Sequence, residues 1–204
     1  MKILAACECS GTVRDAFRKL GHDAWSCDIL PSFSDSKYHY QCDIDEVLYQ
    51  FWDVVIAFPP CTNLAVSGSK YFAQKIADGR QQQGIDFFMK FANLDCQKVV
   101  IENPVGIMSS KWRKPNQIIQ PYEYGHPESK KTCLWIKGLP NLKPTKILTL
   151  PECGHWNNQT KEGQNKLLVN GIWIGFNDPR TPRLRAKTYQ GIADAMAEQW
   201  GINQ

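Results

Sequence analysis

The sequence predicts an α/β protein whose mostly parallel sheet carries helices on both faces, together with a small irregular lobe. Short apolar segments alternate with amphipathic segments through the first half of the chain, which is the pattern of strand–helix–strand units. The apolar segments are nearly continuous, as in strands that are buried on both faces. The length of 204 residues suits one good-sized domain.

The strands and helices follow in order from these patterns. Residues 2–7 form the first strand, and a helix is expected over 12–20 because its apolar residues recur on one face. Thr12 and Asp15 resemble a capping box at the start of that helix, and Gly21 ends it. The remaining elements are a strand at 23–28, a short segment ending at Cys42-Asp43, a strand at 53–58, a helix at 80–94, strands at 98–102 and 132–136, and a helix at 190–200.

Two segments do not follow the alternation of strands and helices. Residues 62–83 contain glycines, serines and a run of glutamines, and we expect them to form a mobile loop that closes over a substrate. The stretch from about 140 to 180 is rich in Pro, Gly, Asn and Lys, and its strands are short. We therefore expect 1–139 and 186–204 to form one domain, and 140–185 to form a small insert in it.

Composition narrows the classes of protein. The chain is 43% hydrophobic and 22% charged, as ordinary globular proteins are, and its net charge of +4 permits contact with a polyanion without requiring it. No apolar run is long enough to cross a bilayer, and Glu8 interrupts the apolar N-terminus, which therefore reads as a strand rather than a signal peptide. We expect no membrane contact.

The eight cysteines indicate a reducing compartment. They contain no Cys-x-x-Cys pair and most lie in apolar segments, so we expect free thiols and a cytoplasmic location, in a bacterial or phage-like host. Cys153 and His155 could supply two zinc ligands, but no second pair accompanies them, and no metal is predicted.

Polar or reactive residues stand at the end of five successive apolar segments. In chain order they are Cys9-Ser10-Gly11, Asp28, Asp43, Pro59-Pro60-Cys61 and Glu102-Asn103-Pro104. Ligands bind at the carboxyl ends of the strands in an open parallel sheet. The five groups are therefore expected to meet at one edge of the sheet and to form a site.

Two of these motifs and a later segment resemble the DNA cytosine-5 methyltransferase family, as a short form with a reduced target-recognition region. Phe58-Pro59-Pro60-Cys61 resembles its nucleophile motif, and Glu102-Asn103-Pro104 resembles its Glu-Asn-Val motif. The segment 124–132 resembles the one in which the family carries Gln-x-Arg-x-Arg. The resemblance implies an S-adenosylmethionine-dependent methyltransferase (Rossmann-like) fold and methyl transfer to carbon 5 of cytosine in DNA.

The resemblance assigns catalytic roles to three residues. The Cys61 thiolate would add to carbon 6 of the cytosine ring, which activates carbon 5 toward a methyl donor. Glu102 would donate to ring nitrogen 3 and accept from the exocyclic amine, and its enclosure would raise its pKa. Lys130 would bind the carbonyl oxygen in place of the family's first arginine, although lysine lacks the bidentate geometry of arginine.

The cofactor implied by the resemblance is S-adenosylmethionine. Asp28 would accept from the ribose hydroxyls and Asp43 from the adenine amine, because carboxylates accept such hydrogen bonds. The turn would let the backbone approach the cofactor. Lys187-Thr188-Tyr189 lies where the family has a further cofactor contact, although Tyr189 is equally typical of a core residue. The candidate cofactor-binding residues are Cys9, Ser10, Gly11, Asp28, Ile29, Asp43, Ile44 and Pro59.

DNA is the expected partner, and Arg180, Arg183 and Arg185 are the expected phosphate contacts on an extended, proline-stiffened segment. The alternative for these arginines is pairing with Asp194 and Glu198 of the last helix. Methylation of RNA or a free cytosine nucleotide stays open, as does a non-catalytic nucleic-acid-binding role. A dehydrogenase-type enzyme is disfavoured because no Gly-x-Gly-x-x-Gly follows the first strand.

Overall fold

The computed structural model describes residues 1–34, 36–152, 154–160, 162–163, 166–169, 172–175 and 177–202. It confirms an α/β architecture with a seven-stranded sheet in the order β3-β2-β1-β4-β5-β7-β6. The strands of this sheet are β1 Lys2–Ala6, β2 Asp23–Asp28, β3 His39–Gln41, β4 Val54–Ala57, β5 Val99–Pro104, β6 Gln117–Ile119 and β7 Thr132–Lys137.

The first five strands run parallel and place their carboxyl ends at one edge of the sheet. The order of the strands reverses direction between β1 and β4, which is the position where open α/β sheets bind ligands. β7 pairs antiparallel with both β5 and β6. The sheet is therefore mixed, and it is compatible with a Rossmann-like arrangement.

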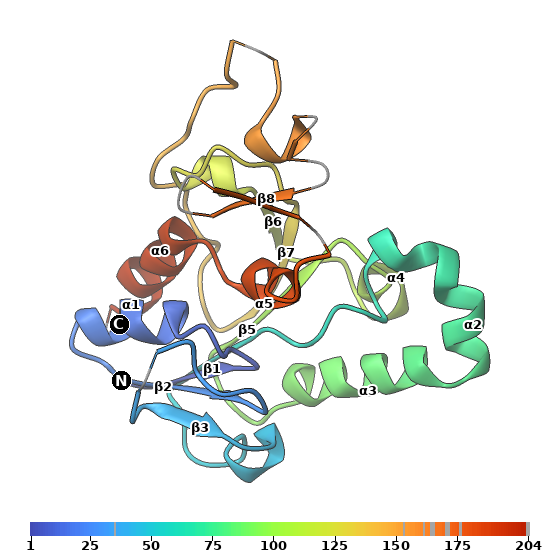
Figure 1. Ribbon diagram of the computed structural model, residues 1–204. Helices are drawn as coiled ribbons and strands as arrows, with labels where there is room; N and C mark the ends of the chain where they lie inside the picture. The colour runs from blue at the N-terminus through green and yellow to red at the C-terminus, as the bar shows by residue number, and fades with distance from the viewer. Residues whose placement is uncertain are drawn as a thin grey trace.

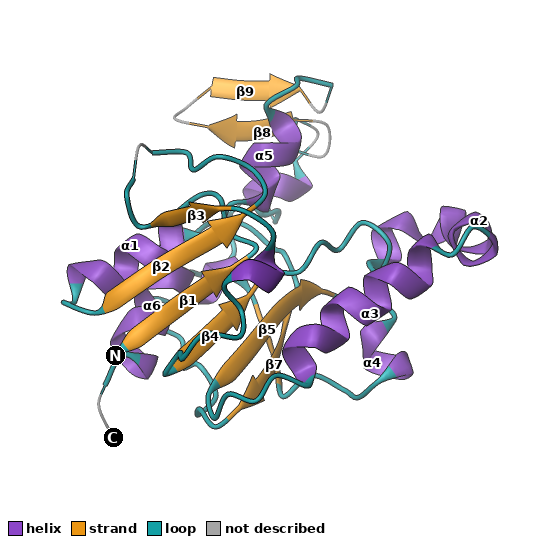
Figure 2. Cartoon of the chain, turned by 90° about the horizontal axis from the view of Figure 1, so that it is seen from below, coloured by secondary structure: helices purple, strands orange, loops and turns teal. Residues whose placement is uncertain are grey.

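Helices cover both faces of the sheet, as Figure 2 shows. On one face, α1 (Thr12–Lys19) packs against α6 (Gln190–Trp200), and α3 (Arg80–Ala92) lies on the other face. A separate hydrophobic core lies on each face, because successive side chains of β1 point to opposite faces of the sheet. Ile3 and Ala5 pack beneath α1 and α6, whereas Leu4 and Ala6 pack with the side chains of α3.

The start of α1 differs from the predicted capping box. Gly11 adopts a left-handed conformation (φ 74°) as the N-cap residue, and no side chain caps the helix from that position. The Thr12 backbone N–H donates to Ser10 Oγ instead, at 3.2 Å. The other end agrees with the prediction, because Gly21 takes a left-handed φ of 85° directly after the helix.

Residues 62–83 are helical for much of their length, so the prediction of a loop is wrong. A 3₁₀ helix, η2 (Val66–Tyr71), leads into α2 (Phe72–Ala77), and Gly79 then begins α3. This segment projects beside α3, away from the sheet, in Figure 1. Lys75 of α2 is buried and donates to the carbonyl of Thr62, which ties the projecting segment back to the residue after Cys61.

The region from 140 to 186 is irregular, as expected, and lies above the sheet in Figure 1. Its described part contains a small antiparallel pair, β8 (Lys166–Val169) with β9 (Ile172–Gly175). The stretch predicted to be extended forms helix α5 (Thr181–Ala186) with Arg180 as N-cap, so that prediction is wrong. Proline is accommodated in the first turn of a helix, where its missing N–H has no partner to lose.

The remaining regular elements are short. They are α4 (Met108–Lys111) and the 3₁₀ turns η1 (Ile44–Glu46), η3 (Pro121–Glu123) and η4 (Asn157–Gln159). Within the part of the chain that is described, no helix has the length and apolarity needed to cross a membrane.

Candidate active site

Cys61 lies in a turn directly after β4. Its carbonyl accepts from the backbone N–H groups of Leu64 and Ala65, both at 2.9 Å, which closes a tight turn after the two prolines. The buried Asn103 donates from Nδ2 to the carbonyl of Pro59 at 2.7 Å. The residue after Glu102 therefore holds the segment that leads to Cys61, a contact that the sequence did not reveal.

The turn after Cys61 is also joined to the turn after β5 through the backbone. Val66 donates to the carbonyl of Val105 and Ile107 donates to the carbonyl of Leu64, both at 3.0 Å. Gly106 fits between them because a Cβ at this position would lie 2.4 Å from the Leu64 carbonyl oxygen. The strand ends that carry Cys61 and Glu102 are thus one hydrogen-bonded unit.

Charged neighbours set the ionisation of the Cys61 thiol, which is partly buried. Burial raises its pKa, and the Glu102 carboxylate raises it further. Lys130 and Arg185 act in the opposite direction and lower the pKa. The structure therefore brings the three predicted catalytic residues together, and it places Arg185 within electrostatic range of Cys61.

Glu102 is the acidic member of this group. Burial raises the pKa of its carboxyl, while the charge of Lys130 lowers it. A carboxyl group in this environment keeps a proton at higher pH than an exposed one does, and it can donate that proton to a bound ring. Lys130 is positioned to stabilise negative charge on both Glu102 and Cys61.

A small pocket, partly open to solvent, lies beside Glu102 and Lys130, and its volume is about 30 Å³. This volume is far below the range of about 300–1,000 Å³ for small-molecule sites. Its wall is completed by the segment between α5 and α6 and by the first turns of α6. The lining residues are Glu102, Lys130, Thr132, Ala186, Lys187, Thr188, Tyr189, Ile192 and Met196.

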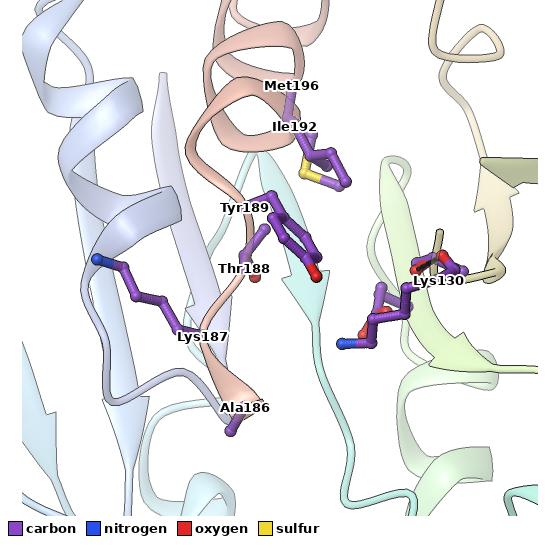
Figure 3. A pocket seen from close by; sticks show the side chains of 9 residues that line it. Lys130, Ala186, Lys187, Thr188, Tyr189, Ile192 and Met196 are labelled. Carbon is purple, nitrogen blue, oxygen red and sulfur yellow. Dashed lines mark hydrogen bonds between the residues drawn. The ribbon is translucent and has the colours of Figure 1, made fainter. Parts of the chain in front are cut away.

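Tyr189 faces Lys130 across this pocket (Figure 3), with the Lys130 Nζ 6.0 Å from the centre of its ring. The Tyr189 hydroxyl donates to the Glu128 carboxylate, and burial together with that carboxylate raises the pKa of the phenol. Lys187 points away from both residues. The sequence placed residues 187–189 near the site only through a weak resemblance, and it did not distinguish Tyr189 from a core residue.

Asp28 and Asp43 lie near each other at the ends of β2 and β3. Both raise the pKa of the buried Cys7 thiol at the end of β1, after the larger effect of burial itself. One oxygen of each carboxylate is used locally: Asp28 Oδ1 accepts from the Leu30 N–H at 2.9 Å, and Asp43 Oδ1 accepts from the Asp45 N–H at 3.0 Å. The Asp43 side chain also accepts from the Glu46 backbone N–H in a capping box, so a ligand would use the acceptor capacity that remains on the two carboxylates.

The other candidate cofactor residues differ in what they can offer. Ile29 is 71% exposed beside Asp28. Ile44 is buried in the core beneath α3, so its side chain is not available to a ligand. The Cys9 carbonyl accepts from the Phe33 N–H at 2.9 Å. Ser10 donates to Glu8 and Gly11 supplies the left-handed turn. The carbonyl of Pro59 is already occupied by Asn103.

Two of the three arginine side chains that were predicted to contact phosphate are described. Arg180 forms a bidentate ion pair with Asp178, at 2.9 and 2.8 Å, on the exposed surface. The Arg183 side chain lies outside the described part of the structure. The charge of Arg185 lowers the pKa of the Cys61 thiol. The alternative partner Asp194 accepts from Gln190 at 2.9 Å.

Metal ligation has no support from the described residues, among which no three His, Cys, Asp or Glu side chains converge. Cys153, one of the two residues considered as zinc ligands, lies outside them.

Replacing Lys130 with glutamine is expected to slow alkylation of Cys61 by iodoacetamide about two- to fivefold at a fixed pH, the effect of losing one partly exposed charge. Lys130 lowers the pKa of Cys61, so its loss raises that pKa and reduces the thiolate fraction. Peptide mapping by mass spectrometry across a pH series measures the rate at Cys61 alone. Lys131→Gln, on the exposed neighbour, should leave the profile unchanged; equal shifts in the two variants contradict a local effect.

A search of protein-family models finds no family that matches the chain, and a search of curated proteins finds no relative. The function must therefore be inferred from the residues of the site.

Proposed function

We propose that the protein is an S-adenosylmethionine-dependent methyltransferase that modifies carbon 5 of cytosine in DNA through a covalent Cys61 adduct. One observation carries this proposal. Cys61 and Glu102 stand on adjacent strand ends that are joined by backbone hydrogen bonds, Glu102 raises the pKa of the Cys61 thiol, and Glu102 and Lys130 line a pocket. A thiol, a buried carboxyl and an ammonium group are the three functions that covalent activation of cytosine requires.

The reaction follows from the positions of these side chains. The Cys61 sulfur forms a bond to carbon 6 of the ring, while Glu102 gives its proton to ring nitrogen 3 and Lys130 binds the carbonyl oxygen. S-adenosylmethionine, when bound, supplies the methyl group for carbon 5. Loss of the carbon 5 proton to water, return of the nitrogen 3 proton to Glu102 and release of Cys61 then restore the aromatic ring.

The carboxylates of Asp28 and Asp43 suit the adenosine part of this cofactor, which is uncharged and carries hydroxyl and amine donors. A hydroxyl or amine hydrogen can bond to the acceptor capacity that the local hydrogen bonds leave on each carboxylate. They occupy the ends of neighbouring strands on the same edge of the sheet as Cys61. The cofactor and the reacting base would therefore meet above β1 and β4.

The size of the pocket constrains the form of the substrate. With a volume of about 30 Å³, it is far too small for a duplex. A cytosine in double-stranded DNA must be flipped out to reach Cys61, at a cost of a few kcal/mol. The small insert and the pairing of Arg180 with Asp178 leave little surface for reading sequence, so low sequence specificity is part of the proposal.

The test is transfer of a labelled methyl group from S-adenosylmethionine to duplex DNA, single-stranded DNA, RNA and cytidine monophosphate. We expect 5-methylcytosine in digested DNA, and a covalent complex at Cys61 with DNA that contains 5-fluorocytosine. Methylation confined to RNA or to the nucleotide would reassign the substrate. Cofactor binding without product on any of the four would favour a non-catalytic role.

A further inference from the structure

Glu8 is a buried carboxylate in the turn between β1 and α1. Its residue exposure is only 4%, and its Oε1 accepts from Ser10 Oγ and from the Val13 N–H, the latter at 3.3 Å. Its second oxygen, Oε2, is buried and has no hydrogen-bond partner among the described residues. A buried acceptor without a donor is unfavourable, which points to a donor that is supplied from outside the chain.

The nearest cation does not supply that donor. The Arg14 guanidinium lowers the pKa of Glu8 through its charge, and the Arg14 backbone N–H lowers it through a hydrogen bond. The guanidinium nitrogens donate instead to Asp15, to Ser26 and to the serines of the loop after β2. The Arg14 side chain is thus held by other partners than Glu8 Oε2.

The position of Glu8 also determines which ligands the turn accepts. The N-terminus of the first helix binds phosphate in many open α/β proteins, through free N–H groups and the helix dipole. In this chain the Glu8 carboxylate takes that place by accepting from the Val13 N–H. A ligand phosphate would meet a carboxylate instead of free donors, whereas an ammonium group would meet an acceptor.

We propose that Glu8 binds the α-ammonium group of the methionine part of S-adenosylmethionine and selects this cofactor against phosphate-bearing nucleotides. The inference rests on the proposed function. Its geometric basis is the order of acidic groups along the sheet edge: Asp43 at β3, Asp28 at β2 and Glu8 at β1. Adjacent strands lie about 4.8 Å apart, so adenine, ribose and amino acid would follow one another toward Cys61 at β4.

Proton release accompanies such binding. Burial raises the pKa of Glu8 in the free protein, and a bound ammonium group lowers it again. Below the raised pKa, the free carboxyl must lose a proton before it can pair with the ligand. The affinity for the amino-acid part is therefore expected to increase with pH until Glu8 is ionised in the free protein.

The experiment measures binding by calorimetry for Glu8→Gln with two ligands. S-adenosylhomocysteine contains the α-ammonium group, and 5′-methylthioadenosine contains the same adenosine and sulfur but no amino acid. We expect affinity for S-adenosylhomocysteine to fall about 10- to 100-fold, the range for a hydrogen bond to a charged group. Affinity for 5′-methylthioadenosine should change less than about twofold. Glu198→Gln, on the exposed surface of α6, is the matched control and should change neither.

Other outcomes separate the two proposals. If wild type binds S-adenosylhomocysteine and Glu8→Gln binds it equally well, the role of Glu8 is wrong and the proposed cofactor stands. Equal losses for both ligands would make Glu8 a structural cap of α1 and would overturn the inference. If wild type binds neither S-adenosylmethionine nor S-adenosylhomocysteine, both the proposed function and the proposed role of Glu8 are wrong.

Discussion

Replacing Cys61 with alanine is expected to lower methyl transfer by about five to six orders of magnitude, the scale on which enzymes lose activity without their nucleophile. Among the described thiols none is expected to take its place. Cys27 and Cys133 belong to the core, Cys7 and Cys42 pack against it, Cys9 is buried, and Cys96 is bonded to backbone carbonyls before β5. Binding of S-adenosylhomocysteine should be retained. The rate is measured as labelled methyl groups incorporated per enzyme in single turnover.

The control for this variant is Cys96→Ala, which removes a partly buried thiol at the opposite end of the strands. It should keep wild-type turnover and still form the covalent complex with DNA that contains 5-fluorocytosine. The Cys61 variant should form no such complex. Full turnover by Cys61→Ala would refute a covalent mechanism, whatever the cofactor.

The second large effect is expected for Glu102→Gln, which should reduce turnover about 10²- to 10⁴-fold, the usual contribution of a general acid. Glutamine keeps the shape of the side chain but cannot give a proton to ring nitrogen 3. Burial raises the pKa of Glu102, so the acid form persists to higher pH and is lost as pH rises through that pKa. The thiolate of Cys61 increases as pH rises toward its own raised pKa. The pH–rate profile should therefore be bell-shaped, and Glu102→Gln should remove its alkaline limb.

Asp28→Ala distinguishes this effect from a general loss of structure at the sheet edge. It should weaken binding of S-adenosylhomocysteine and leave turnover at saturating cofactor close to wild type. Glu102→Gln should show the reverse pattern. Parallel losses of affinity and rate in the Glu102 variant would assign it a structural role.

Local patterns in the sequence located the regular elements that carry the site. The range 190–200 for the last helix and 23–28 for the second strand agree with the structure, because apolar spacing and flanking turns determine such segments directly. The junctions after the strands were also apparent, since polar residues interrupt apolar runs there. Convergence of these junctions follows once β1 to β5 run parallel.

Features that depend on tertiary contacts could not be predicted in this way. The antiparallel direction of β7 is decided by its pairing with β5 and β6, and β6 is only three residues long. The arginine-rich segment was expected to be extended, but proline in a first turn is equally compatible with α5. Contacts such as Asn103 with Pro59 join residues 44 positions apart and leave no local signal.

The backbone hydrogen bonds between the turns after β4 and β5 determine how mutations in these turns can be compensated. Gly106 and the Leu64 carbonyl approach each other so closely that a side chain at 106 must displace the main chain at 64. A mutation in either turn is therefore expected to move Cys61 and Glu102 together, so the two turns should tolerate change only jointly. Substitutions that compensate for a defect at Gly106 are expected at residues 64–66, which share backbone hydrogen bonds with the turn after β5, rather than at the sequence neighbours of Gly106.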